Sequence, residues 1–361
     1  MKLGQILALV QELASARGPC GQEDEVREIV LRELGRHCDR VWTDEAENAV
    51  GLIRGRSPRG AKGRPAPVVQ VMAHMDELSL IVKRVEADGS LRVRQLGGLA
   101  PWAIGLGPVE ILGDRRRLPG VLSVGSLHTT AETPEAWRSK VTGEGRTVDW
   151  PQVRVFTRLG TAELAAAGVH PGTRVVIGQA ARQFVEIQDC VAGRFMDDRA
   201  PLAAMVAAAA QLAAARRRPA ADVYLVGTCG EELGNGPAPF SAGSLGAGIS
   251  LALEVGPVAG EYGTVLSADP IVVYRDRRVL YSKAVADRLV EVGRSLGMHP
   301  QRAVYESYGT DASAAQSSGR VPRSGALCIP TDNTHGCEVI AKAGLANCAR
   351  LLAAYLQAPV G

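Results

Sequence analysis

The sequence lacks the long apolar segments that mark membrane proteins. No stretch reaches the roughly 18 consecutive apolar residues that a membrane-spanning helix needs. The first residues place their apolar side chains at helical spacing, and no long apolar stretch with a small-residue cleavage site is present. We therefore expect an amphipathic first helix, no leader peptide and no membrane partner.

Cysteine pairs with the spacing of a metal site or a disulfide framework are also absent. The seven cysteines are odd in number, scattered along the chain, and never spaced as Cys-x-x-Cys. Free thiols in a reducing compartment are the simplest interpretation, because disulfides persist mainly in oxidising compartments. We therefore expect a cytoplasmic protein.

A large excess of one charge is missing as well. The chain carries 41 basic and 38 acidic side chains, which gives a formal net charge of +3 over 361 residues. A protein that binds nucleic acid usually has a strongly basic surface, so we expect no nucleic-acid partner. The short arginine runs at 115–117 and 216–218 are interpreted as solvated surface.

Hydrophobic residues make up 46% of the chain, which is enough for the cores of two domains. Up to about residue 77 and again from about 188, helical patterns alternate with apolar runs of strand length; they include an alanine-rich helix at about 200–217 and a final helix at about 338–357. Between 78 and 187, short alternating runs separated by Gly, Pro and Asp are typical of β structure. We predict an α/β core formed by residues 1–77 and 188–361, with a β-rich domain inserted at 78–187.

Side chains that can bind metal ions stand at the ends of the predicted core strands or open the helix that follows the insert. They are His74, Asp197, Glu231, Glu232, Glu254 and His335. Ligands of open α/β sheets gather at the edge formed by the carboxyl ends of the strands. We therefore expect these side chains to converge there.

The chemical types suit a pair of divalent ions. Two imidazoles and three carboxylates, one of them able to bridge, can hold two four- or five-coordinate zinc, cobalt or manganese ions. Two such ions about 3.5–4 Å apart can activate a water and polarise a scissile carbonyl. A further carboxylate must take the proton of that water and pass it to the leaving amine, and the Glu231–Glu232 doublet offers a base beside a ligand.

Each residue also has a structural interpretation. His74 with Asp76 could be a hydrogen-bonded pair, and Asp197 with Asp198 could cap a helix. An acidic doublet such as Glu231–Glu232 usually lies on solvated surface. Their joint occurrence at strand ends favours a shared site over these separate interpretations.

Eight segments, in order, carry a family resemblance. They are Gly18-Pro19-Cys20-Gly21, Ala73-His74-Met75-Asp76-Glu77, Gly97-Gly98, Gly168-Val169-His170-Pro171-Gly172, Met196-Asp197-Asp198-Arg199, Gly230-Glu231-Glu232-Leu233-Gly234, Gly309-Thr310-Asp311-Ala312 and the segment around His335. Over nearly the whole chain, they resemble the glutamyl aminopeptidase (tetrahedral aminopeptidase) family of dinuclear metallopeptidases. Some relatives in that family have been labelled endoglucanases.

The resemblance implies a role for each candidate ligand. His74 and Glu254 bind one metal ion, and Glu232 and His335 bind the other. Asp197 bridges the two ions. The pair of divalent ions is expected to be zinc, with cobalt or manganese also compatible.

The resemblance also implies that Glu231 is the general base and that Asp76 contacts and orients His74 without binding a metal ion itself. The chain departs from the family in three places, one of which is the turn after Glu232, where it reads Gly234-Asn235-Gly236-Pro237 instead of the usual form. The family commonly has Asp where this chain has Glu254, and an Arg-Tyr and a His-Ser where it reads Thr331-Asp332-Asn333-Thr334-His335-Gly336. We expect these departures to affect substrate preference more than metal binding.

The family's architecture is a mixed-sheet zinc-exopeptidase core with an inserted β-rich domain, a barrel or PDZ-like fold. The resemblance therefore implies a discontinuous catalytic domain at 1–77 and 188–361 and an oligomerisation domain at 78–187. It further implies a homo-oligomer built from dimers, a dodecamer with inward-facing sites. The implied reaction is the metal-dependent removal of N-terminal residues from peptide substrates.

Three other interpretations remain. Dinuclear carboxypeptidases and N-acyl amino-acid deacylases share the core but carry their extra domain after the acidic doublet, whereas here the insert precedes Asp197. A glycosidase would need two carboxylates beside a sugar and has no use for the histidines. A catalytically silent scaffold would lack ligands, and no expected ligand type is missing.

A preference for substrates with an acidic N-terminal residue would require basic groups in the pocket. The sequence alone does not show which residues form that pocket.

Overall fold

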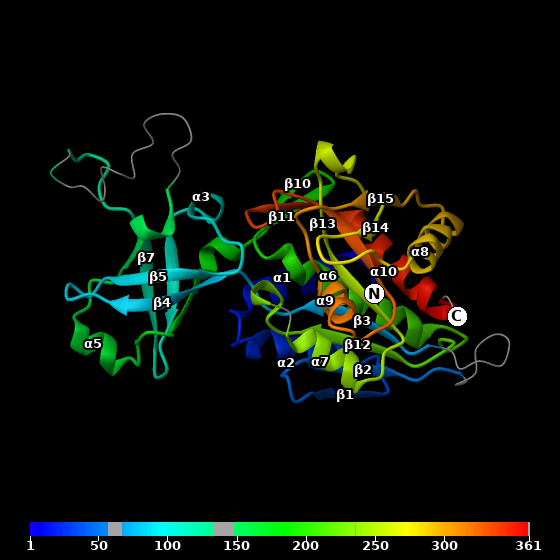
Figure 1. Cartoon of the computed structure of the whole chain (residues 1–361). Helices are drawn as coiled ribbons and strands as arrows, with labels where there is room; N and C mark the ends of the chain where they lie inside the picture. The colour runs from blue at the N-terminus through cyan, green and yellow to red at the C-terminus, as the bar shows by residue number, and fades with distance from the viewer. Residues whose placement is uncertain (57–66, 131, 133–147, 235, 360–361) are drawn as a thin grey trace.

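The computed structural model describes residues 1–56, 67–130, 132, 148–234 and 236–359, which form an α/β core and a small barrel (Figure 1). An 11-stranded mixed sheet lies at the centre of the core in this part of the chain. Its strands are β1 (Arg40–Thr43), β2 (Ala49–Ile53), β3 (Val69–His74), β10 (Val185–Ile187), β11 (Cys190–Gly193), β12 (Val223–Thr228), β13 (Ile249–Pro257), β14 (Ile271–Arg275), β15 (Gln301–Val304), β16 (Ser324–Asp332) and β17 (Glu338–Ala341). The order is β1-β2-β12-β3-β13-β16-β17-β11-β10, with β14 paired to both β15 and β16.

The central strands β12, β3, β13 and β16 are parallel to one another. They read as nearly continuous apolar runs because both faces of a parallel sheet are covered, and all six residues of β3 are buried. Parallel strands end at the same edge of a sheet. His74, the last residue of β3, therefore lies beside Thr228, the last residue of β12.

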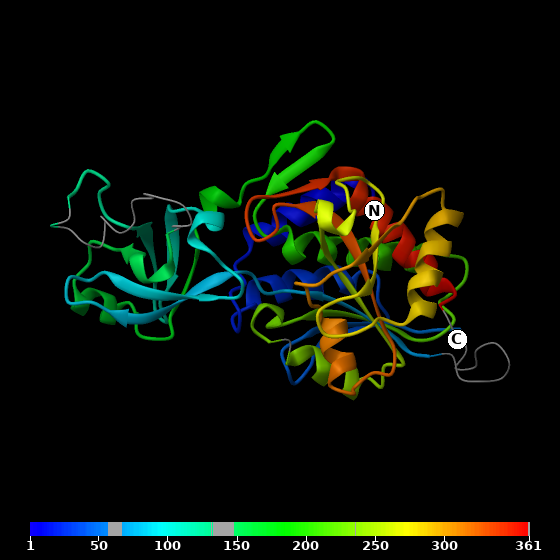
Figure 2. The same cartoon turned by 45° about the horizontal axis from the view of Figure 1, so that its top comes forward.

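Helices cover both faces of this sheet (Figures 1 and 2). The helices and 3-10 turns of the core are α1 (Leu3–Ser15), α2 (Asp24–Gly35), η3 (Gln179–Arg182), α6 (Met196–Ala214), η4 (Glu231–Leu233), α7 (Pro237–Ser244), η5 (Gly260–Tyr262), α8 (Lys283–Ser295), α9 (Asp311–Ser317) and α10 (Lys342–Gln357). Val71 of β3 belongs to a hydrophobic cluster with α1, α6 and α10, whereas its neighbour Met72 belongs to a cluster with α7 and α9. Because successive side chains of a strand point to opposite faces, these clusters are the two sides of the sheet. No helix of the described ranges is both long and apolar enough to span a membrane.

The predicted final helix begins later than expected. Residues 338–341 form strand β17 instead, which pairs with β11 and β16. Val339 and Ile340 are β-branched and favour an extended backbone in a sheet. The helix itself, α10, starts at Lys342.

The barrel lies inside the predicted insert. Its strands are β4 (Ser79–Val85), β5 (Leu91–Leu96), β6 (Pro108–Leu112), β7 (Arg117–Ser123), β8 (Arg154–Phe156) and β9 (Arg174–Ile177), and its short helices are α3 (Pro101–Ile104), η2 (Trp150–Gln152) and α5 (Thr161–Ala166). The strands close in the order β4-β5-β8-β7-β6-β9 around their own hydrophobic cluster. Positions 131 and 133–147 of the insert lie outside the described residues. The predicted fold class, an α/β mixed-sheet core with a β-barrel, is confirmed.

A buried ion cluster lies where the chain enters and leaves the barrel. Glu77 follows β3, Arg182 lies in η3 and Arg199 lies in α6, and all three side chains are fully buried. Arg182 Nη1 and Arg199 Nη2 each donate a hydrogen bond of 2.9 Å to Glu77 Oε2. Two guanidinium groups thus share one carboxylate, so its removal would leave buried charge without compensation.

Replacing Glu77 with glutamine should lower the free energy of unfolding by about 3–5 kcal/mol, because both arginines lose their counter-charge. Glu291→Gln is the matched control, since its partner Arg288 and Glu291 itself are 36% and 65% exposed and their pair contributes at most about 1 kcal/mol. Urea unfolding followed by tryptophan fluorescence compares the two variants. Equal losses would contradict the assigned importance of the buried cluster.

Candidate active site

The structure brings all six candidate side chains around one cavity of about 510 Å³. His74 comes from the end of β3, Asp197 from the start of α6, and Glu254 from β13. Glu231 and Glu232 lie in η4, just after β12. His335 lies in the turn between β16 and β17.

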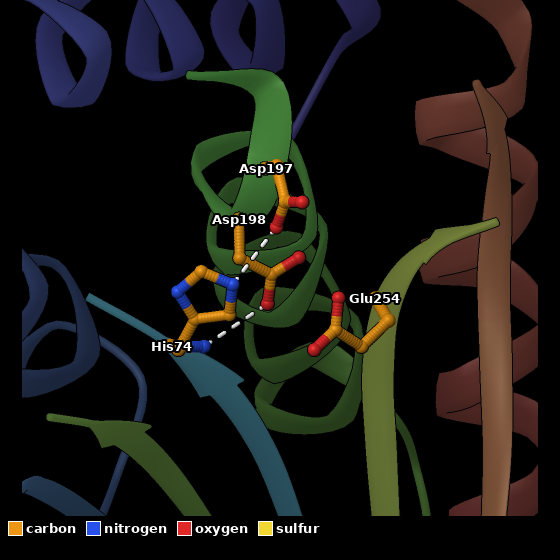
Figure 3. A group of neighbouring side chains, drawn as sticks. All are labelled: His74, Asp197, Asp198 and Glu254. Carbon is orange, nitrogen blue, oxygen red and sulfur yellow. Dashed lines mark hydrogen bonds and ion pairs between the residues drawn. The ribbon is translucent and has the colours of Figure 1, made fainter. Parts of the chain in front are cut away.

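The first group of possible ligands consists of His74, Asp197, Asp198 and Glu254 (Figure 3). Each offers one ligand atom, and these atoms lie within 4.8 Å of one another. His74, Asp198 and Glu254 are buried. Asp198 also accepts a hydrogen bond from the backbone N–H of His74 at 3.0 Å, which ties the start of α6 to the end of β3.

The second group consists of Asp197, Glu232 and His335, whose ligand atoms also lie within 4.8 Å of one another. Asp197 is therefore common to both groups. Its Oδ1 lies 2.8 Å from Nε2 of His74, and its Oδ2 lies 3.7 Å from Nε2 of His335. Each oxygen of one carboxylate thus faces a different imidazole, which is the arrangement that a bridging ligand needs.

Asp76 links His74 to the acidic doublet. Its Oδ1 lies 3.3 Å from Nδ1 of His74, opposite the ring nitrogen that faces Asp197. The same carboxylate accepts backbone N–H hydrogen bonds from Glu231 at 3.0 Å and Glu232 at 3.1 Å. Burial would raise the pKa of Asp76, but the interaction with His74 outweighs burial and lowers it. Asp76 therefore remains ionised and fixes the orientation of both elements.

The donor set fits divalent cations. Burial raises the pKa of Glu232, Glu254 and Asp198 well above the usual carboxyl range, and the neighbouring carboxylates raise it further. Among the described residues, no lysine or arginine forms an ion pair with these three groups, and Asp198 Oδ1 has no hydrogen-bond partner. Several buried oxygens without a cationic side chain are suited to binding metal ions, which would supply the missing positive charge.

Glu338 is a site residue that the sequence analysis missed. Its side chain is buried, and Oε1 accepts the backbone N–H of His335 at 3.0 Å while Oε2 accepts that of Asp197 at 3.1 Å. One carboxylate thereby positions a residue from each of two distant segments. Burial raises the pKa of Glu338 to about 8. The signal in the sequence was an acidic residue three positions after His335, which the predicted helix concealed.

The chain is similar to known proteins in both sequence and structure. The model of the M42 glutamyl aminopeptidase family matches residues 59–351. The lysyl aminopeptidase of Pyrococcus furiosus is 27% identical over 250 residues, which cover 68% of this chain. The match spans 65% of the lysyl aminopeptidase, slightly less than two thirds of its length.

Solved structures share the whole architecture. An aminopeptidase from the archaeon Desulfurococcus kamchatkensis superposes with a TM-score of 0.85 and 25% identity over 99% of this chain and 96% of that one. The TET1 peptidase of Pyrococcus horikoshii, described as assembling into a tetrahedron or a large octahedral shell, superposes with a TM-score of 0.81 and 22% identity over 98% and 99% of the two chains. The likeness to the TET1 peptidase shows a common fold. Because the family model covers most of the chain, the protein belongs to the M42 glutamyl aminopeptidase family.

Proposed function

We propose that this protein is a dinuclear metalloaminopeptidase that removes N-terminal residues from peptides. The observation that carries the proposal is the position of Asp197, which belongs to both donor groups and turns one oxygen toward each imidazole. Membership of the M42 family supports the same reaction class.

The proposed ligand assignment takes its members from the two donor groups and leaves Asp198 to hold the backbone of His74. His74 and Glu254 hold one ion, while Glu232 and His335 hold the other. Asp197 lies between the ions. The mixture of imidazole and carboxylate ligands favours zinc, and cobalt or manganese would also fit.

The chemistry that bound ions supply is a lowered pKa for a water molecule and a polarised scissile carbonyl. Glu231 lies at the wall of the cavity and takes the proton from the attacking water, then delivers it to the leaving amine. Asp76 holds the backbone of Glu231 and the ring of His74 in fixed positions, so base and ligand keep a constant geometry. Glu338 does the same for Asp197 and His335.

We also propose a homo-oligomer built from dimers, closing as a dodecamer. Solved TET1 peptidase structures, one described as a dodecamer and one as assembling into a tetrahedron or a large octahedral shell, support it. So does the β10–β11 hairpin, which projects from the edge of the sheet and leaves Val185 and Ile187 59% and 50% exposed (Figure 2).

We further propose a cytoplasmic location. The seven cysteines are all free, which supports it.

Cleavage of a leucyl tripeptide and of its N-acetylated form tests the proposed reaction. We expect the free-amine peptide to be cleaved at its N-terminus. Its kcat/KM should exceed that of the acetylated peptide by about tenfold to hundredfold or more, because acetylation removes the ammonium charge and leaves the acidic groups that would bind it without a partner. Preference for the acetylated peptide would indicate a deacylase, and release of the C-terminal residue a carboxypeptidase. Cleavage of neither form by the metal-loaded protein would indicate a scaffold.

A further inference from the structure

Two arginines line the active-site cavity together with the six candidate residues. Arg277 and Arg278 belong to the turn that follows β14. Arg277 is exposed and Arg278 is half-buried. Within the described residues, neither guanidinium forms an ion pair with a carboxylate. Both are therefore available to a negatively charged group that enters the cavity.

The turn that carries these arginines is held rigidly by Asp276, whose side chain is fully buried. Asp276 Oδ1 accepts the backbone N–H of Arg278 at 2.8 Å and that of Val279 at 2.9 Å. Its Oδ2 accepts the hydroxyl of Tyr281 at 2.8 Å, and this hydroxyl lies 2.8 Å from Oγ1 of Thr310. Solvated surface arginines do not need such a support, whereas a binding site does.

The same segment that forms the cavity wall also places the arginines. Arg277 N donates to the carbonyl of Tyr308 at 3.0 Å, and Arg278 Nη1 donates to the carbonyl of Thr310 at 3.3 Å. A Cβ added to Gly309 would lie 3.4 Å from Cζ of Arg278, so the guanidinium lies directly against this glycine. Tyr308 and Gly309 line the cavity as well. The backbone of Arg277 and the guanidinium of Arg278 are thus held at its wall.

The charges of the cavity are divided between acidic and basic residues. Its acidic residues Asp197, Glu231, Glu232 and Glu254 suit metal ions and a peptide ammonium group, whereas Arg277 and Arg278 suit an anion. Arginine binds carboxylates with paired, charge-assisted hydrogen bonds. Resting on the proposed aminopeptidase activity, we infer that Arg277 and Arg278 form a subsite for a carboxylate of the peptide.

That carboxylate has two possible sources within a peptide. It is either the acidic side chain of the N-terminal residue or the C-terminal carboxylate of a short peptide. An N-terminal lysine would bring a third cation next to two guanidinium groups. If the subsite takes the side chain of the N-terminal residue, this chain should therefore not share the preference named for the lysyl aminopeptidase of Pyrococcus furiosus.

Paired substrates separate these sources. Glutamyl- and glutaminyl-p-nitroanilide have the same shape, lack a C-terminal carboxylate and differ only in side-chain charge. Leucyl-glycyl-glycine and its C-terminal amide differ only at the other end. In the metal-loaded wild-type protein, one of these two pairs should show a kcat/KM about tenfold to hundredfold higher for the charged member. The Arg277→Gln/Arg278→Gln double variant should bring that ratio close to one.

Arg275→Gln is the control, because Arg275 is exposed on β14 and does not line the cavity. It should keep the wild-type ratio. Leucyl-p-nitroanilide, which offers no carboxylate, should be cleaved at similar rates by the wild-type protein and by Arg275→Gln. Failure of the proposed function would abolish this cleavage in every form, whereas failure of the present inference would leave it intact with both ratios unchanged by the double variant.

Binding of the free amino acids gives a second measurement that is independent of turnover. Calorimetry should show that the double variant loses affinity for glutamate but not for glutamine if the side chain is the source. Affinity for leucyl-glycyl-glycine is measured in the Glu231→Gln background, where the peptide is not turned over. If the double variant lowers this affinity instead, the subsite takes the C-terminal carboxylate. Unchanged affinity for glutamate and for the tripeptide would overturn the inference.

Discussion

Replacing Glu231 with glutamine should reduce kcat by about 100- to 10,000-fold, the range that positioned proton transfer contributes, while bound metal stays at the wild-type level. An amide has nearly the same shape as the carboxylate but cannot accept the proton of the attacking water. The backbone N–H of Glu231 would still donate to Asp76, so the turn itself should remain in place. Metal ligation falls to other residues in the proposed assignment.

Steady-state hydrolysis of leucyl-p-nitroanilide and metal analysis of the same sample measure both effects. Glu261→Gln is a suitable control, because Glu261 is an exposed residue of η5 and does not line the cavity. Wild-type activity in the Glu231→Gln variant would show that another group is the base. Loss of metal together with activity would assign Glu231 to the ligands instead.

Replacing Asp197 with asparagine should impair both metal sites. The amide keeps one oxygen but replaces the other by an NH₂ group, which cannot serve as a ligand. Because the two oxygens of Asp197 face His74 and His335 separately, at least one donor group loses a member. We expect kcat/KM to fall by more than the roughly 10- to 100-fold that loss of an outer-shell partner costs.

Metal content distinguishes this variant from Glu231→Gln, since Asp197→Asn should bind fewer ions per chain. Asp189→Asn provides the matched control, because Asp189 is exposed just before β11 and belongs to neither donor group. A fully loaded but inactive Asp197→Asn protein would mean that the carboxylate acts in the reaction and does not bridge metals.

The convergence of the candidate ligands could be predicted because it depends on a simple property of parallel strands. His74, Glu231 and Glu254 come from neighbouring parallel strands or the turns that follow them, so chain direction alone places them at one edge. The inserted β structure was also readable from its alternating pattern. Closure into a barrel was not, since alternation along a strand does not fix which strands pair.

The supporting residues of the site could not be found in this way. Arg277 and Arg278 follow β14, which runs antiparallel to β16, so the strand-end rule does not place them at the active edge. They reach the cavity through contacts with the segment around Tyr308 and Thr310, which depend on tertiary packing. Glu338 was concealed by a helical interpretation of the segment that forms β17. Its two hydrogen bonds join residues far apart in the sequence.

A zinc titration of the chelator-treated protein tests the central claim most directly. Bound zinc per chain and hydrolysis of leucyl-p-nitroanilide are measured at each addition, for the wild-type protein and for Asp197→Asn. The wild-type protein should be inactive without metal and should recover full activity only as a pair of ions binds to each chain, while Asp197→Asn should bind fewer and remain inactive. Full activity in the metal-free protein, or at one ion per chain, would contradict a dinuclear site bridged by Asp197.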